Sequence, residues 1–253
     1  MVDPGADKTI RLTPMDLTIL FEHFPCFRVS TYRALHRCYW PDRPIDAVKK
    51  WVGRMTQGGL IAGAPLYDNT QYYYLTEHAT RVGNQPERLA RPLSPFLLAQ
   101  AFGILAFSLL GEKTFRKIPA AEFESRFPDL SPAKLDGTFY YHDPDYQDDA
   151  NPAMKRIGYL IVDSGRRVRD IVARFCKSIS QRLAFRSWRE LIERRRFVIG
   201  IVTTAEGKAD RLRAALDPIR RNVLLRIEVR EELRFVVPLR TPHVDATDRR
   251  NQP

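Results

Sequence analysis

Residues 45–75, IDAVKKWVGRMTQGGLIAGAPLYDNTQYYYL, combine a helical pattern with a hairpin pattern. The first half carries apolar side chains at the i, i+3, i+4, i+7 spacing of one buried helix face, namely Ile45, Val48, Trp51, Val52 and Met55. The pair Gly58-Gly59 ends this helix, and two short strand-like runs, 60–66 and 71–75, flank a turn of sequence YDNT. The stretch therefore predicts a helix that leads directly into a β-hairpin.

Two more helices are expected before this stretch. The first starts at the pair Thr13-Pro14 and ends near Pro25, and the second starts near Ser30 and stops at the sequence WPDRP. Three helices followed by a hairpin are the element order of a winged helix-turn-helix. The sequences MTQGGLI and QYYYLTEHA also resemble the end of the recognition helix and the end of the wing in that family. The resemblance covers residues 12–83 and implies double-stranded DNA as the partner.

The third helix of such a module enters the major groove, while the second helix and the wing contact phosphates. The candidates for groove contact are the cations of the third helix, Lys49, Lys50 and Arg54. The candidates for backbone contact are Arg33, Arg37, Arg43, Asn69 and Gln71. Two other interpretations are open: these residues form only a solvated face, or the winged helix docks a protein. With one acid, Asp46, against three bases on the third helix, we favour DNA.

The composition favours a folded protein with a polyanionic partner. The chain has 253 residues, 44% of them hydrophobic, and a net charge of +11 with more arginines than lysines. Arginine suits bidentate contacts to phosphate and to guanine. The three cysteines lack the spacing of a zinc site, and no signal peptide is expected. We therefore predict that the protein is located in the reducing cytoplasm. The apolar run 96–110 is shorter than the ~20 residues of a membrane span, which predicts a buried helix and no membrane partner.

The remaining two thirds of the chain alternate short β-rich runs with helical patterns. The β-rich runs are LDGTFYYHD, RIGYLIVDS, RFVIGIVTT and LLRIEVREELRFVVPL, and helices are expected at 120–127, 166–194 and 205–216. This alternation predicts an α/β domain with a mixed, partly parallel sheet. The expected division is 10–84 for the winged helix, 85–112 for a linker and the apolar helix, 113–240 for the α/β domain and 241–253 for a disordered tail.

The helical region 166–194 combines an apolar stripe with many basic side chains, Arg182 among them. The candidates for contact with a phosphate backbone are Arg166, Arg167, Arg174 and Lys177. The alternative is a solvated face that Asp170, Glu190 and Glu193 partly neutralise.

The plan of the whole chain resembles the replication-relaxation family of plasmid and mobile-element proteins. The features that carry the resemblance are the winged-helix order, the apolar helix, the sequences LDG and IVDSG, a long basic helix, the strand VIGIVTT and the sequence KADRLRAAL. The family implies a second domain related to the PD-(D/E)XK nuclease fold. Such nucleases hold Mg²⁺ between acids on two neighbouring strands, and a lysine two residues after the second acid steadies developing charge.

The residues at the matching positions are Asp136 and Asp163. The catalytic set is incomplete, because Ile161 occupies the acid position within the strand and Gly165 stands where the lysine is required. Asp163 is therefore expected to cap the turn or helix that follows, and the two aspartates are only vestigial metal candidates. The chain contains no nucleotide-binding loop, and no cofactor is expected.

The sequence predicts an α+β protein: a winged helix-turn-helix followed by a nuclease-like α/β domain that is not an enzyme. We expect a cytoplasmic, sequence-specific DNA-binding protein, either a transcriptional regulator or a replication or transfer factor of a mobile element. The second domain would form a homodimer or add DNA contacts. Two alternatives are open: a Mg²⁺-dependent nuclease or nicking enzyme that uses Asp136 and Asp163, and an adaptor whose winged helix docks a protein.

Overall fold

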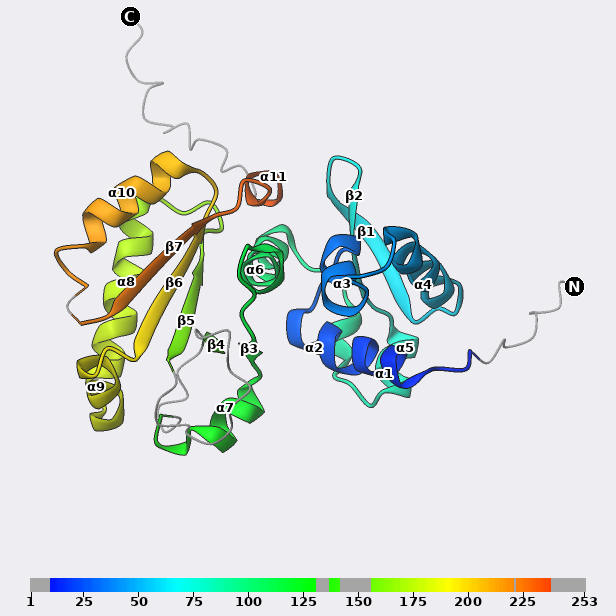
Figure 1. Ribbon diagram of the computed structural model, residues 1–253, viewed down its shortest axis with the longest axis horizontal. Coiled ribbons are helices and arrows are strands. Elements are labelled where there is room, and N and C mark those ends of the chain that lie inside the picture. The colour runs from blue at the N-terminus through cyan, green and yellow to red at the C-terminus, as the bar shows by residue number, and fades with distance from the viewer. Residues whose placement is uncertain (1–9, 131–136, 142–155, 221, 238–253) are drawn as a thin grey trace, which may run out of the picture.

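A computed structural model describes residues 10–130, 137–141, 156–220 and 222–237 of the chain (Figure 1). Within these residues the fold is mixed α and β with a mixed sheet, as the sequence predicts. A helical N-terminal part with a small hairpin precedes a five-stranded sheet, and the helix α6 (Pro95–Leu105) lies between the two.

Three helical segments and a hairpin form the N-terminal part. The first segment runs through α1 (Pro14–Thr18), the π-helical stretch η1 (Ile19–His23) and α2 (Phe24–Phe27), and the others are α3 (Tyr32–Tyr39) and α4 (Ile45–Gln57). The hairpin pairs β1 (Ile61–Tyr67) with β2 (Thr70–Leu75) in antiparallel register, and α5 (Glu77–Val82) follows. Threonine side chains cap α1, α3 and α5 by accepting hydrogen bonds from first-turn amides.

The apolar face predicted for α4 packs into the core of this part, with one exception. Val48, Trp51, Val52 and Met55 are buried. Ile45 was expected beside them, but it is exposed because it is the first residue of the helix and lies beyond the packed turns.

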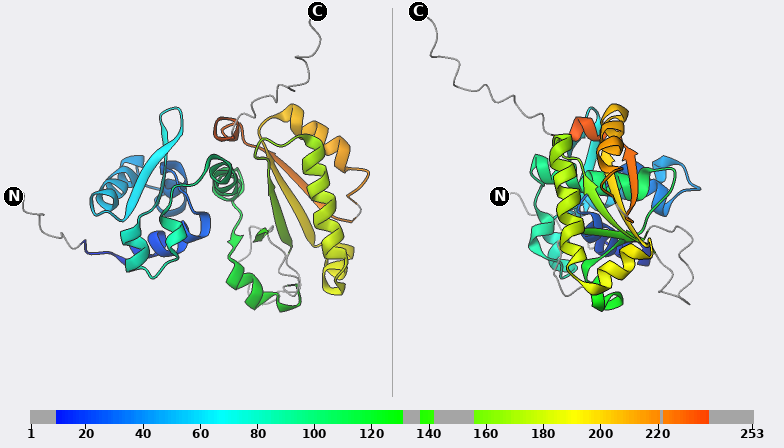
Figure 2. Two further views of the ribbon diagram at one scale, coloured as in Figure 1. Left: turned by 180° about the vertical axis from the view of Figure 1, so that it is seen from behind. Right: turned by 90° about the vertical axis from the view of Figure 1, so that its left-hand side faces the viewer.

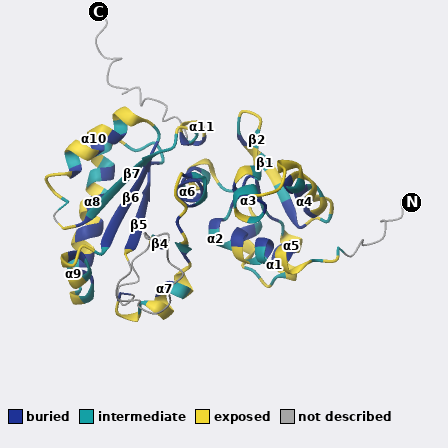
Figure 3. Cartoon of the chain, in the orientation of Figure 1, coloured by how far each residue is buried: buried dark blue, intermediate teal, exposed yellow. Residues whose placement is uncertain are grey.

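The sheet has the order β3-β4-β5-β6-β7 within the part of the chain that the structure describes. Its strands are β3 (Lys117–Ile118), β4 (Thr138–Tyr141), β5 (Ile157–Val162), β6 (Phe197–Thr203) and β7 (Leu224–Val229). The pairs β3-β4 and β4-β5 are antiparallel, whereas β5-β6 and β6-β7 are parallel. β5 and β6 are buried at every position, which is typical of parallel strands covered on both faces (Figure 3).

Helices cover both faces of the sheet. They are α6, α7 (Ala120–Arg126), α8 (Val168–Leu183), α9 (Arg186–Glu193) and α10 (Glu206–Leu216), with the short turn η4 (Pro128–Leu130) after α7. The short helix α11 (Leu233–Val236) packs against α6 and β1, and the turn η2 (Glu87–Ala90) packs against α5 and β2. α8, α9 and α10 pack on one face and α6 on the other (Figure 2). The helical region expected at 166–194 is broken at residues 184–185 into α8 and α9. The last β-rich run is a strand only as far as Val229, because Leu233 and Val236 are buried one helical turn apart in α11.

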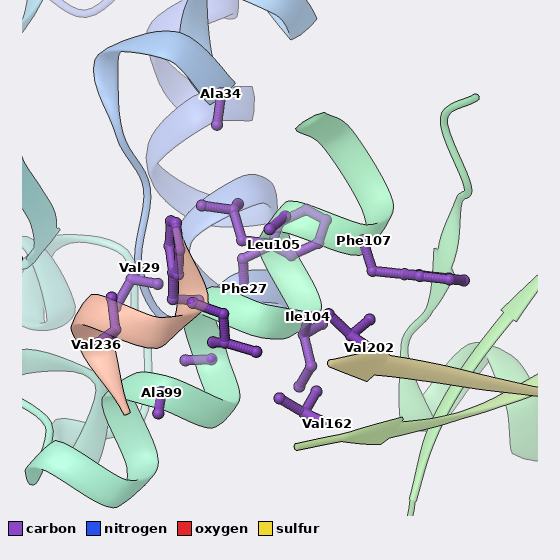
Figure 4. Close-up of a cluster of buried hydrophobic side chains, with 14 of the residues drawn as sticks. Phe27, Val29, Ala34, Ala99, Ile104, Leu105, Phe107, Val162, Val202 and Val236 are labelled. Carbon is purple, nitrogen blue, oxygen red and sulfur yellow. The ribbon is translucent and has the colours of Figure 1, made fainter. Parts of the chain in front are cut away.

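The expected buried helix forms α6 and its π-helical continuation η3 (Ala106–Leu110). Side chains from α2, β5, β6 and α11 meet around it, among them Phe27, Val162, Val202 and Val236 (Figure 4). The apolar helix expected after the linker is therefore the centre of a hydrophobic core that the two parts of the chain share. Among the described helices, none is long and apolar enough to cross a membrane.

Candidate nucleic-acid interface

The helix α4 presents its cations to solvent. Lys49, Lys50 and Arg54 are exposed, whereas Val48, Trp51, Val52 and Met55 of the same helix are buried. The Lys49 ammonium pairs with the Asp46 carboxylate at 2.9 Å, one turn earlier on the same helix. Lys50 has no hydrogen bond or ion pair to any residue that the structure describes, so its charge is available to a partner.

Arg54 also has a structural contact, because it pairs with a buried carboxylate. Asp16 is 1% exposed, and its Oδ1 accepts hydrogen bonds from Trp51 Nε1 at 2.6 Å and from Arg54 Nη2 at 2.7 Å. Its Oδ2 accepts from the amide of Thr13 at 2.8 Å, as part of a capping box. Burial alone would raise the pKa of Asp16, but the hydrogen bonds from Thr13, Trp51 and Arg54 outweigh it and lower that pKa. This network fixes α1 against α4 and orients the cationic face.

The two arginines of α3 that were predicted to contact phosphates instead contact residues beyond the N-terminal part of the chain. Arg33 Nη1 lies 3.6 Å from the Glu232 Oε1 that precedes α11. Arg37 Nη2 donates to the carbonyl oxygen of Glu112, just after η3, at 3.3 Å. Arg43, by contrast, is exposed just before α4. The structure therefore keeps Arg43 near the α4 cations and uses Arg33 and Arg37 in intrachain contacts.

The hairpin also packs against α11. The rings of Tyr67 and Phe235 stack with centroids 5.7 Å apart, which brings the hairpin beside α11 (Figure 1). Asn69 is exposed in the turn, and Gln71 is exposed on β2, where its Oε1 accepts from the Tyr73 hydroxyl at 3.3 Å. Both predicted contact residues of the hairpin are thus accessible.

A second basic surface follows α8. Arg167 and Lys177 are exposed and Arg174 is half-buried, so these three predicted contacts share one helix and its N-terminal cap. Arg166 differs from them, because its guanidinium lies over the Phe96 ring, 5.6 Å from the centroid, and its Nε is buried. The structure therefore directs Arg166 toward α6.

The expectation that Arg182 lies on this basic surface is wrong. Its side chain is 1% exposed, and its guanidinium lies within 5.5 Å of the centroids of four aromatic rings, those of Phe139, Tyr159, Trp188 and Phe197. Nη1 donates to the carbonyl oxygen of Ser178 at 2.9 Å. Burial lowers the pKa of Arg182 to about 10. The rings come from β4, β5, β6 and α9, so the periodicity of α8 alone could not show this site.

The carboxylate of Asp163, at the end of β5, is fully buried and fully occupied. Its Oδ2 lies 2.6 Å from Lys208 Nζ and accepts from Thr203 Oγ1 at 2.8 Å. Its Oδ1 accepts from the amide of Arg166 at 3.1 Å, so it closes the turn before α8, as the sequence predicts. Lys208 also donates to the carbonyl oxygen of Arg166 at 2.6 Å. Asp163 thus links the ends of β5 and β6 to the start of α10.

A metal ion at Asp163 would have to displace Lys208 from the carboxylate. Asp136 lies outside the described residues. Within the described ranges, no group of three His, Cys, Asp or Glu side chains could hold a metal ion. The structure shows at Asp163 an ion pair with Lys208 that links β5 and α10.

Sequence reasoning missed Asp16 and Lys208. The first was detectable, because an acid three residues after Thr13 has the spacing of a capping box. The second was not, since no local pattern connects Lys208 with Asp163. Comparisons of the chain with models of protein families, with curated proteins and with solved structures found no match.

Proposed function

We propose that the chain is a sequence-specific double-stranded DNA-binding protein whose residues 10–84 form a winged helix-turn-helix. The observation that best supports this is α4, a helix of 13 residues that buries one face and exposes Lys49, Lys50 and Arg54 on the other. A single helix of this kind fits the major groove of B-DNA, where lysine and arginine can donate to guanine. The net charge of +11 favours the encounter with a polyanion.

The second part of the chain adds phosphate contacts through Arg167, Arg174 and Lys177, and it holds two copies together as a homodimer. Paired modules raise affinity and specificity, because a dimer can bind two half-sites at once. By its resemblance to the replication-relaxation family, this part is a nuclease-like fold without the chemistry. The biological setting that follows is transcriptional control, or replication or transfer of a mobile element, in the cytoplasm.

The two alternatives have weaker support. A nuclease would need Asp163 free for a metal, and its carboxylate is held by Lys208, Thr203 and the amide of Arg166. A protein-docking adaptor would use the same exposed α4, but an excess of cations fits phosphate better than it fits a typical protein surface.

The test is binding of the full chain to a fluorescent duplex from its own upstream region and to a scrambled duplex, measured by anisotropy over a salt series. We expect a preference for the upstream duplex, and a loss of about 1 in the slope of log K against log salt for Lys50→Ala. Lys113→Ala is the matched control, since Lys113 is exposed outside α4. Equal affinity for both duplexes, unchanged by Lys50→Ala, would contradict the proposal. Mg²⁺-dependent strand cutting on a denaturing gel would support the nuclease instead.

A further inference from the structure

The strand β7 has an open edge. It is the last strand of the sheet among the described residues, and all six of its positions are half-buried, whereas β5 and β6 are buried throughout. A strand that pairs on one side only leaves a row of amide and carbonyl groups ready to pair with another chain. Its sequence, LLRIEV, contains no proline or glycine that would prevent such pairing.

The hydrogen-bond pattern shows which peptide groups face outward. The amide of Arg230 donates to the Thr203 carbonyl of β6 at 2.8 Å. Peptide groups alternate in direction along a strand, so the even-numbered residues of β7 bond to β6. The outward groups are therefore those of Leu225, Ile227 and Val229.

We propose that two copies of the chain dimerise by antiparallel pairing of β7 with β7 of the second copy, around a two-fold axis at Ile227. The outward groups permit three registers with two-fold symmetry in which most of the strand pairs. An axis at Arg226 sets two arginines opposite each other, and an axis at Glu228 sets two glutamates opposite each other. An axis at Ile227 sets Arg226 opposite Glu228 of the second copy, twice, and so extends the ion pairs that Glu228 already forms with Arg226 and Arg230 of its own chain. Opposite charges across the strands stabilise a pair and like charges destabilise it, so the charges select this register.

The same register also matches apolar side chains on the other face of the sheet. Leu225 lies opposite Val229 of the second copy, and Ile227 lies opposite its own copy. Leu225 and Ile227 already pack against the core under α10, and they line a groove between β7 and α10. The other residues that line the groove are Arg213, Ala214, Asp217 and Arg220. A two-fold axis perpendicular to the sheet brings the two α10 helices to the same side of the joined sheet.

This interface would be the dimer interface of the proposed DNA-binding function. The inference rests on the proposed function only for what the dimer does, not for whether it forms. If a monomer binds DNA, β7 could still pair with a second copy. If the chain forms a dimer through β7 but does not bind DNA, the inference about β7 would still be correct. The experiments below therefore contain no DNA.

The first experiment is the mass of the full chain in solution, by analytical ultracentrifugation over a wide range of concentration. We expect twice the chain mass of 29.3 kDa at high concentration, and a monomer for Ile227→Lys, which places two ammonium groups at the axis. Val82→Lys is the matched control, because Val82 is 56% exposed on α5, far from β7 in the chain, and it should remain a dimer. Circular dichroism and the melting temperature show whether each variant is folded. A monomer at every concentration would overturn the proposal.

The second experiment tests the register by disulfide formation. In a hydrogen-bonded antiparallel pair the two Cα atoms are about 5.5 Å apart, within the range of a disulfide. Ile227→Cys should therefore cross-link with itself, and Leu225→Cys should cross-link with Val229→Cys but not with itself. The unsubstituted chain gives the background from Cys26, Cys38 and Cys176. A cross-link between Leu225→Cys and Ile227→Cys in its place would show the register at Arg226. A dimer that forms none of these cross-links, and that survives Ile227→Lys, would show that β7 is not the interface.

Discussion

Replacement of Asp163 should destabilise the fold, because the residue is part of a buried ion pair. Asp163→Ala leaves the Lys208 ammonium, whose side chain is 17% exposed, without its anion, and leaves the hydroxyl of Thr203 without its acceptor. Removal of one partner from such a pair costs about 3–5 kcal/mol of unfolding free energy. For a chain of this size that corresponds to a fall in Tm on the order of 10 °C.

The assay is urea denaturation followed by circular dichroism, for the single variants Asp163→Ala, Asp163→Asn and Lys208→Met and for one double variant. Lys208→Met should cost about as much as Asp163→Ala, because it leaves a carboxylate with no exposed surface uncompensated. The double variant Asp163→Asn, Lys208→Met removes both charges of this buried pair. Its cost should therefore fall below the sum of the costs of Asp163→Asn and Lys208→Met by about 2 kcal/mol.

The same variants separate a structural from a metal-binding aspartate. A carboxylate kept free for a metal lowers the free energy of unfolding when no metal is bound. Its replacement would therefore stabilise the chain, and Mg²⁺ would no longer stabilise the variant. The reasoning is refuted if Asp163→Ala costs less than about 1 kcal/mol, or if the effects of Asp163→Asn and Lys208→Met simply add.

Three further predictions concern the N-terminal part. Burial lowers the pKa of His23 to about 4 from its ordinary 6.5. In the unfolded chain His23 therefore binds a proton at a higher pH than in the folded chain, which favours unfolding. About 3 kcal/mol of stability should be lost as the pH falls from 6.5 to 4. His23→Gln, which can keep the hydrogen bond to Ser30, should flatten urea midpoints measured over that range, and an unchanged pH profile would contradict this. Arg54→Met should cost about 1–2 kcal/mol in urea denaturation, because Asp16 keeps its bonds from Trp51 and Thr13 but loses a charged one, and a wild-type midpoint would rule out this contribution. Lys50→Ala should leave the urea midpoint unchanged and weaken DNA binding in anisotropy, whereas a loss of stability would show a structural contact at Lys50.

Local patterns predicted the elements of the fold well. The order of three helices and a hairpin, the buried face of α4 and the strands β5 and β6 follow from apolar patterns, which report on the environment of each segment. The turn at Asp163 follows from the same local reasoning. The break between α8 and α9 and the helix α11 were missed, because buried contacts decide them and propensity does not.

The candidate site was predictable only in part. The exposure of Lys49, Lys50 and Arg54 follows from the helical period, since the opposite face of α4 is apolar. The engagement of Arg33 with Glu232 does not, because α3 and α11 meet only in the folded chain. Arg182 shows the same limit, since a basic residue on an amphipathic helix reads as exposed until the surrounding rings are known.

The sequence by itself therefore determined most of the helices and strands, the buried face of α4, and that the chain is strongly basic. These properties depend on neighbours within one or two turns of the chain. Only the tertiary structure decided that Asp163 pairs with Lys208, that α6 joins the two parts in one core, and that β7 pairs on one side only among the described residues. Each of these depends on contacts between residues far apart in the sequence, and such contacts leave no trace in local periodicity.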